Sequence, residues 1–460
     1  MKPFLPDIIR LLAVTALLYV TSVPAIAAEF HAGLGRADIT PKDPIWLAGY
    51  AGRNKPSEGI DQKLNVKALA LKDATGATTV IVSADTIGTG RQFTDTVAAR
   101  LAEKYNLPRE RFLFAASHSH NTPVIYGNLT DMYGLAPEHL ETVKRYTKFF
   151  EDQVVVAAEQ ALNSLEPVRL KFAEGNAGFA GNRREFGPAG VKFGINPTGP
   201  VDHSVPVLRI EREDGTLKSI LLGYACHCTT PGTEYKVSGD WAGYAQEYLE
   251  LTYPGTSALF ITGCGADANP NPRGSFLYAR QHGLALAGSV ARVLNEPMRE
   301  VKGPITARFA NVDLPIGTPP GKAYYEGMLT NKAPAVQRYA HRHIGMIERG
   351  EPFMKSYPCP VQVFRFGSDL TMIALGGEVV VDYAHRLRRE LPQEKLWVSA
   401  YCNDVFAYVP SMRILTEGGY EADFNLIYYG IPYRFAPSVE DTLVKAIKGL
   451  VQQPAVVKEK

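Results

Sequence analysis

Short apolar runs alternate with segments of helical periodicity along most of the chain. The apolar runs have the length of strands and predict them at residues 64–71, 79–84, 112–117, 168–173, 205–212, 218–226, 258–262 and 372–375. Between these runs, apolar residues recur every three or four positions, which predicts helices at residues 93–105, 138–162, 279–294 and 380–389. The alternation predicts an α/β fold.

The connections between these elements refine the prediction. The turn residues Glu213-Asp214-Gly215 separate two of the predicted strands and favour an antiparallel hairpin. We therefore expect mixed parallel and antiparallel sheets flanked by helices rather than a purely parallel sheet. The glycine and proline clusters of Asn182–Asp202 predict a loop, and the basic, helically patterned segment Lys332–Arg349 predicts a solvated surface helix.

The first residues have the pattern of a secretory signal peptide. Lys2 and Arg10 precede the apolar run Leu11–Val20, and the small residues Ala25–Ala28 follow it. We expect cleavage after residue 28 and a secreted or periplasmic protein. An uncleaved anchor is the alternative, because Asp7 is unusual so near the start of such a signal.

The rest of the chain, residues 29–460, is predicted to form a single domain without repeats or a linker. No later segment approaches the roughly 20 apolar residues of a membrane helix, so we expect no stable membrane span. A formal net charge of +2 gives no reason to expect a nucleic acid partner. Of the five cysteines, Cys226 and Cys228 flank His227 and are interpreted as buried small residues or as disulfide partners, rather than as metal ligands.

Four candidate metal ligands lie at the ends of short apolar strands. His118 and His120 end the strand at 112–117, where residues two apart share a face and can enter one cleft. His227 follows another strand, and Glu378 precedes a helix. Taken singly, these patterns are more typical of hydrogen-bonded structural histidines for His118 and His120, of a core histidine for His227 and of a helix-start carboxylate for Glu378. Together they favour a zinc site with an open position that activates water, because zinc accepts imidazole and carboxylate ligands.

Several short motifs, in the same order along the chain, resemble the catalytic domain of neutral ceramidases. The resemblance runs from about residue 33 to the C-terminal helix and so covers nearly the whole chain after the predicted signal peptide. The motifs are Gly35-Arg36-Ala37-Asp38-Ile39-Thr40-Pro41, Ala116-Ser117-His118-Ser119-His120, Gly181-Asn182-Arg183, Ser238-Gly239-Asp240 and Gly376-Gly377-Glu378.

The resemblance implies roles for specific residues. By it, the zinc ligands are His118, His227, Glu378 and Tyr408, and the residues that contact the substrate are His120, Arg183 and Tyr420. Tyr408 follows Asn403 by five residues, as the ligand tyrosine does in the family. The alternatives are a surface salt bridge for Arg183 and a packed loop aromatic for Tyr420.

The chain also departs from the family pattern. Asn269 stands where ceramidases have a serine, in a register that is uncertain by one residue, and asparagine can form hydrogen bonds but cannot act as a nucleophile. Thr122-Pro123-Val124 replaces the usual glycine-proline-glycine. We also expect the C-terminal β-sandwich that is typical of ceramidases to be missing. These differences argue against recognition of a long-chain lipid by this protein.

The sequence therefore predicts an exported Zn²⁺-dependent hydrolase that cleaves the amide bond of a small-molecule substrate, either ceramide-like or another N-acylated compound, by metal-activated water. One alternative is cleavage of a glycosidic, ester or lactone bond, and another is a non-catalytic zinc-containing binding protein. An amidohydrolase barrel is disfavoured by the predicted hairpin and by Tyr408.

Overall fold

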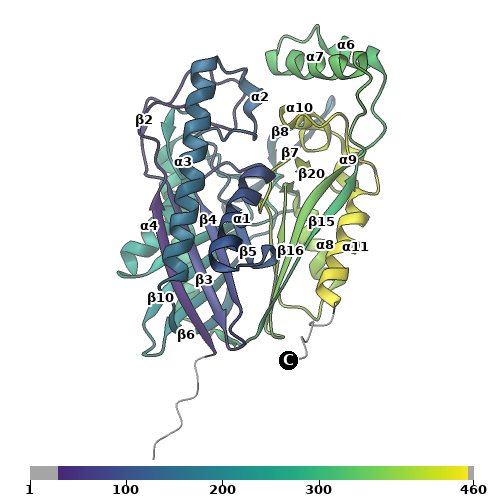
Figure 1. Ribbon diagram of the computed structural model, residues 1–460. Coiled ribbons are helices and arrows are strands. Elements are labelled where there is room, and N and C mark those ends of the chain that lie inside the picture. The colour runs from purple at the N-terminus through teal and green to yellow at the C-terminus, as the bar shows by residue number, and fades with distance from the viewer. Residues whose placement is uncertain (1–28, 454–460) are drawn as a thin grey trace, which may run out of the picture.

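The computed structural model describes residues 29–453, so the predicted signal peptide at residues 1–28 lies outside the described residues. The protein is a mixed α/β structure in which helices lie on the outer sides of two large sheets (Figure 1). Every strand and helix predicted in the first paragraph above is present, with its ends within three residues of the expected positions. The predicted fold class is confirmed.

The larger sheet has antiparallel and parallel pairs. β9 and β10 form the predicted antiparallel hairpin, whereas β10–β12 and β4–β5 are parallel. In spatial order the sheet contains β12 (Ser257–Thr262), β10 (Leu217–Tyr224), β9 (Ser204–Arg212), β6 (Glu166–Asn176), β1 (Phe30–Asp38), β3 (Asn65–Asp73), β4 (Thr78–Ala84) and β5 (Phe112–Ala116), with β14 (Arg299–Val301) beside β6.

This sheet curls until its two ends approach each other. The Ser83 hydroxyl in β4 donates to the carbonyl of Phe260 in β12 (2.5 Å), and the Thr262 hydroxyl donates to the carbonyl of Ala116 (2.8 Å). The carboxyl ends of β5, β10 and β12 therefore meet at one end of the molecule, a position where α/β proteins commonly build sites.

The second sheet packs against the first through a shared apolar core. It consists of β15 (Ile305–Pro315), β16 (Ser356–Phe366), β17 (Leu370–Leu375) and β19 (Leu396–Ser399). Leu113 and Ile261 of the larger sheet share one buried cluster with Phe364 and Met372 of the second. Because side chains of both sheets fill this cluster, the strand ends of the first sheet are held in a fixed position relative to those of the second.

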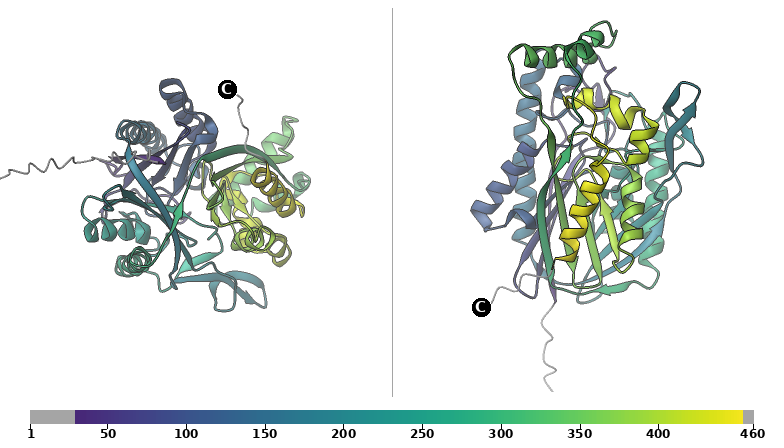
Figure 2. Two further views of the ribbon diagram at one scale, coloured as in Figure 1. Left: turned by 90° about the horizontal axis from the view of Figure 1, so that it is seen from below. Right: turned by 90° about the vertical axis from the view of Figure 1, so that its right-hand side faces the viewer.

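Helices cover the outer faces of both sheets, as Figure 2 shows from below. α1 (Arg91–Tyr105), α3 (Pro137–Leu162), α4 (Asp240–Thr252) and α5 (Phe276–Leu294) belong to the larger sheet, and α8 (Val381–Glu390) and α11 (Val439–Gln452) to the second. Gly35 lies directly under α3, where a β-carbon would come within 1.9 Å of the Ala157 carbonyl oxygen. This close approach explains why the first ceramidase-like motif contains a glycine.

The segment Asn182–Asp202 is not the predicted loop. β7 (Ala180–Gly187) and β8 (Gly190–Asn196) form a hairpin that pairs with β13 (Ala268–Pro270). Its first glycine and proline cluster forms the tight turn between the strands, and the prediction wrongly extended that turn to the whole segment. The predicted surface helix is present as α7 (Pro334–Glu348), which packs beside α6 (Lys322–Met328) at the top of Figure 1.

Several short elements complete the described chain, which are β2 (Gly59–Ile60), β11 (Lys236–Val237), β18 (Glu378–Val379), β20 (Tyr408–Val409), α2 (Thr130–Tyr133), α9 (Met412–Glu417), α10 (Leu426–Tyr429), a 3-10 turn (Arg109–Arg111) and a π-helical turn (Tyr420–Phe424). All five cysteines are buried and unpaired, so the disulfide alternative for Cys226 and Cys228 is wrong. Within residues 29–453 no helix has the length and hydrophobicity to cross a membrane.

Candidate active site

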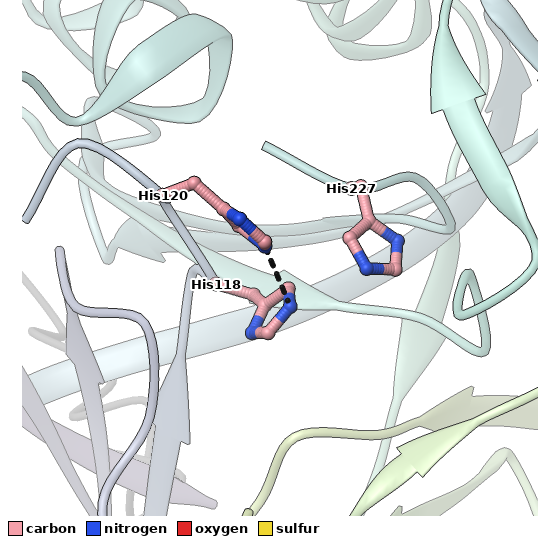
Figure 3. Close-up of side chains that lie close together, drawn as sticks. All are labelled: His118, His120 and His227. Carbon is pink, nitrogen blue, oxygen red and sulfur yellow. Dashed lines mark hydrogen bonds between the residues drawn. The ribbon is translucent and has the colours of Figure 1, made fainter. Parts of the chain in front are cut away.

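His118 and His120 converge at the end of β5, although not through an extended backbone. The strand ends at Ala116, and His118 has a positive φ of 60°. Its ring nevertheless meets that of His120, with the two Nε2 atoms 3.2 Å apart (Figure 3). The predicted proximity is therefore correct, but its predicted cause, the alternation of a strand, is not.

Backbone carbonyls fix the tautomer of both rings. His118 Nδ1 lies 2.6 Å from the Ile87 carbonyl oxygen, and His120 Nδ1 lies 3.2 Å from that of Gly49. Because a carbonyl only accepts hydrogen bonds, each Nδ1 carries the hydrogen and each Nε2 presents a lone pair to the centre. Two lone pairs 3.2 Å apart call for a positive charge between or beside them.

His227 reaches the same centre from the loop after β10. Its backbone N–H donates to the Ala268 carbonyl (3.1 Å), and Nδ1 lies 3.0 Å from the Gly265 carbonyl oxygen. The Nε2 lone pair again points inward, toward the other two rings in Figure 3. Nitrogens of the three buried histidines lie within 4.8 Å of one another, a separation at which one metal ion can contact them.

Glu378 and Tyr408 enter as neighbours in a two-stranded ladder. Glu378 lies in β18 and is directly opposite Tyr408 in β20, so the two side chains project from one face. Glu378 Oε2 lies 3.0 Å from His118 Nε2 and 3.1 Å from His227 Nε2, and the Tyr408 hydroxyl lies 3.1 Å from His227 Nε2. The interpretation of Glu378 as a helix-start carboxylate is therefore wrong, since α8 begins only at Val381.

The spacing of these donors is compatible with one bound metal ion of the size of zinc. Zinc bonds of about 2.0–2.2 Å place neighbouring donors about 3.3–3.6 Å apart, close to the 3.0–3.1 Å that separates Glu378 Oε2 and the Tyr408 hydroxyl from the histidine nitrogens. The backbone-bound Nδ1 atoms are the second-shell contacts that orient ligating imidazoles. Glu378 Oε2 lies 3.0 Å from His118 Nε2 and 3.1 Å from His227 Nε2, whereas His120 Nε2 lies 3.2 Å from His118 Nε2.

The protonation states also suit a cation. Burial, together with the Arg183 guanidinium, lowers the pKa of His227 to about 4, and burial and the adjacent histidines hold the pKa of His120 well below its usual value. Burial alone would raise the pKa of Glu378, but His118 and His227 outweigh it and keep the pKa well below normal. Near neutral pH the cluster thus contains two neutral imidazoles and a carboxylate, which are the ligating forms.

Arg183 links this centre to a buried carboxylate. Arg183 is 3% exposed, so the surface salt-bridge alternative is wrong. Its Nη2 donates to the Tyr408 hydroxyl (3.0 Å), and its Nε donates to Glu421 (2.8 Å). Burial raises the pKa of Tyr408 well above its usual value, while the Arg183 guanidinium acts to lower it. A second cation at the hydroxyl would therefore be needed to form a phenolate.

Tyr420 and Asn269 border the centre. The Tyr420 ring, at the start of the π-helical turn, lies 5.2 Å from that of Tyr408 and 4.8 Å from that of Phe193. Asn269 Oδ1 accepts from the Thr229 hydroxyl (3.2 Å) and from Arg183 Nη1 (3.4 Å). The structure thus brings all eight predicted site residues together, and their roles remain predictions.

One site residue was missed from the sequence. The Tyr429 hydroxyl, on α10, donates to Glu378 Oε1 (2.7 Å), the oxygen that faces away from the histidines. Tyr429 stands in Leu426-Ile427-Tyr428-Tyr429, where nothing distinguishes it from its neighbour. Only its contact with Glu378 identifies it.

Comparison with known proteins identifies the family. The sequence model of the neutral/alkaline non-lysosomal ceramidase N-terminal region matches residues 30–311. The chain belongs to this ceramidase family. The resemblance seen in the motifs is thereby confirmed. The matched span contains the three clustered histidines, Arg183 and Asn269 but ends before Glu378.

Individual ceramidases are similar over part of their length. Neutral ceramidase B of Dictyostelium discoideum is 27% identical over 271 residues, which cover 54% of this chain and 36% of that protein. Neutral ceramidase of Drosophila melanogaster is 24% identical over 276 residues, which cover 54% and 37%. The match therefore spans little more than a third of the length of these relatives.

Solved ceramidase structures share the fold over nearly the whole chain. The neutral ceramidase of Pseudomonas aeruginosa superposes with a TM-score of 0.69 at 20% identity, covering 94% of this chain and 76% of its own. A ceramidase structure described as complexed with C2 gives the same score and identity, covering 94% and 77%. The fold thus extends beyond the matched span to the segments that carry Glu378 and Tyr408.

Proposed function

We propose that this protein is a zinc-dependent hydrolase that cleaves the amide bond of a ceramide-like or other N-acylated small molecule. Membership of the ceramidase family supports hydrolysis of an amide. The observation that carries the proposal is the convergence of two fixed imidazole lone pairs, a carboxylate and a phenol in one buried centre. We also propose export, on the basis of the signal-like pattern of residues 1–28.

In this proposal His118, His227, Glu378 and Tyr408 hold the ion. Two imidazoles favour zinc over magnesium or calcium, which take oxygen ligands. When bound, zinc polarises a carbonyl oxygen and lowers the pKa of a water molecule toward about 7. The low pKa of Glu378 supports an ionised carboxylate in this set.

His120 is proposed as the general base. Its Nδ1 hydrogen is directed to the Gly49 carbonyl, which leaves the Nε2 lone pair beside the donor cluster. A neutral imidazole there can accept a proton from the attacking water and then deliver it to the leaving amine. Until His120 has taken up that proton, its Nε2 bears a lone pair and cannot donate a hydrogen bond to an oxyanion.

Arg183 and Tyr420 are proposed to act on the substrate. Glu421 fixes the Arg183 guanidinium, which keeps a permanent positive charge next to Tyr408. A fixed cation next to the centre can stabilise the oxyanion that forms when an amide is attacked. The Tyr420 ring lies 5.2 Å from the Tyr408 ring and can orient the substrate. Asn269 lacks the chemistry of a nucleophile and serves as a hydrogen-bonding residue.

The test combines metal analysis with product detection. Purified wild-type protein, His118→Ala and the control His341→Ala, which changes an exposed histidine of α7, are analysed for zinc by plasma mass spectrometry. The same samples are incubated with ceramide and with short N-acyl compounds, and released amines and fatty acids are measured.

We expect one zinc per chain and amide hydrolysis in the wild type and in His341→Ala, with both lost in His118→Ala. Equal zinc in all three proteins would contradict the ligand assignment. Zinc binding without release of amine from any substrate would contradict the proposed amide hydrolysis and favour a non-amide bond or a binding role.

A further inference from the structure

A cavity of about 270 Å³ lies beside the proposed catalytic centre. One wall is the β7–β8 hairpin, which projects from the side of the molecule (Figure 2, right). The rest of the lining comes from Asn269, Pro270, Asn271 and Arg273, in β13 and just after it, next to the hairpin strand β7. The hairpin contributes Phe193 and Ile195, which are 53% and 59% exposed. The cavity is therefore open to solvent on an apolar side.

Two contacts connect the cavity to the centre. Asn269 lines the cavity and accepts from Arg183, whose other nitrogen donates to Tyr408. Arg273 also lines the cavity, and its Nη2 donates to the Tyr50 hydroxyl (3.2 Å). The Tyr50 ring in turn lies 5.0 Å from that of His120. The cavity is thus linked to Tyr408 through Arg183 and to His120 through Tyr50, so a substrate held in it would lie close to the catalytic centre.

The one charged group that lines the cavity is the Arg273 cation, and no lining carboxylate neutralises it. Across residues 29–453, Arg273 forms no ion pair, in contrast to Arg183 with its Glu421. The Oδ1 of Asn269 is already occupied by Thr229 and Arg183, so its amide N–H₂ is the free part of that side chain. These groups favour an anionic oxygen ligand.

We propose that this cavity binds an anionic oxygen group of the substrate, a carboxylate or a phosphate, and that Arg273 selects for it. The apolar part of the same substrate would lie against Phe193 and Ile195. An arginine fork binds such groups through paired hydrogen bonds. The proposal rests on the proposed function and narrows it: the substrate class is an acidic N-acyl compound, rather than neutral ceramide.

The test compares an acid with its neutral analogue. N-lauroylglycine and N-lauroylglycinamide differ only in that charge, and kcat/KM for both is measured with wild-type protein, Arg273→Gln, Arg273→Lys and the control Arg145→Gln, an exposed arginine of α3. N-lauroyl-ethanolamine phosphate is a third substrate that separates phosphate from carboxylate recognition. We expect Arg273→Gln to lower kcat/KM for the preferred acid by at least about tenfold. For the neutral N-lauroylglycinamide, kcat/KM should stay within about twofold of the wild-type value.

Arg273→Lys should retain part of the preference because it keeps the charge. If Arg273→Gln lowers kcat/KM equally for the acid and for N-lauroylglycinamide, or lowers it for neither acid, the proposal is overturned. If wild-type protein cleaves none of the substrates, the proposed amide hydrolysis is contradicted. Binding of the same compounds is then measured by calorimetry, which tests the cavity separately. Binding of an acid at least about tenfold more tightly to wild type than to Arg273→Gln supports the cavity's role, and equal binding overturns it.

Discussion

Tyr429 provides a sharp test of how the proposed metal site is supported. Its hydroxyl is 2.7 Å from Glu378 Oε1, while Oε2 of the same carboxylate faces His118 and His227. Glu378 is 3% exposed, so water cannot readily replace this donor. Tyr429→Phe removes one hydrogen bond to a charged group and keeps the ring in place.

The structure sets the size of the expected effect. A hydrogen bond to a charged group contributes about 1.5–3 kcal/mol, and loss of an outer-shell partner weakens metal binding by about 10- to 100-fold. These two ranges agree, because about 1.4 kcal/mol corresponds to a factor of ten in affinity. We therefore expect Tyr429→Phe to raise the zinc Kd by about 10- to 100-fold.

The zinc Kd is measured by equilibrium competition with a chelator for wild type, Tyr429→Phe and Tyr428→Phe. The last variant removes the neighbouring hydroxyl on α10, whose ring lies among Tyr420 and Phe424 instead of at the carboxylate. It should bind zinc within about twofold of wild type. A Tyr429→Phe protein with wild-type affinity would refute the reasoning that Glu378 is a ligand oriented by Tyr429.

Two further predictions concern buried charges around the site. Glu421 forms ion pairs with Arg183 and Arg184, and all three side chains are at most 4% exposed. Glu421→Gln should therefore lower the free energy of unfolding by about 3 kcal/mol and the thermal midpoint by about 3 °C, and it should reduce activity. In the same thermal scans, Glu351→Gln, at an exposed residue, should change the midpoint by less than about 1 °C. A midpoint equal to that of Glu351→Gln would contradict this. Burial raises the pKa of Asp267 to about 7 in the folded protein, against an ordinary 3.8, so the folded state binds more protons and Asp267 reduces stability as pH rises from about 4 to 7. Asp267→Asn should make urea unfolding less dependent on pH across that window, and an unchanged slope would show that Asp267 ionises normally.

The predictions from sequence succeeded where local pattern controls structure. The strand at 112–117 was found because it is a continuous short apolar run, and the helix at 138–162 because its apolar residues recur at helical spacing. Asn182–Asp202 was predicted wrongly because glycine and proline mark a turn without showing how far strands extend on either side. The backbone reversal at His118 could not be predicted either, since its positive φ depends on contacts made by distant residues.

Glu378 and Tyr408 illustrate a different limit. The family resemblance selected both residues, but their pairing across β18 and β20 has no trace in either local sequence. No motif or residue spacing in the sequence indicated Tyr429, and its contact with Glu378 joins positions 51 residues apart. Such contacts arise from the packing of whole elements, which a local pattern does not encode.

The sequence by itself determined the α/β order of elements, the hairpin at residues 213–215 and a set of residues able to bind a metal, because propensity and periodicity act between near neighbours. Only the tertiary structure decided which nitrogen of each histidine faces inward, which oxygen of Glu378 meets them, and that Arg273 lies in a cavity without a carboxylate. These features depend on atoms that folding brings together from far apart in the chain, and a hydrogen bond or an electrostatic interaction is decided by distance in space rather than along the sequence.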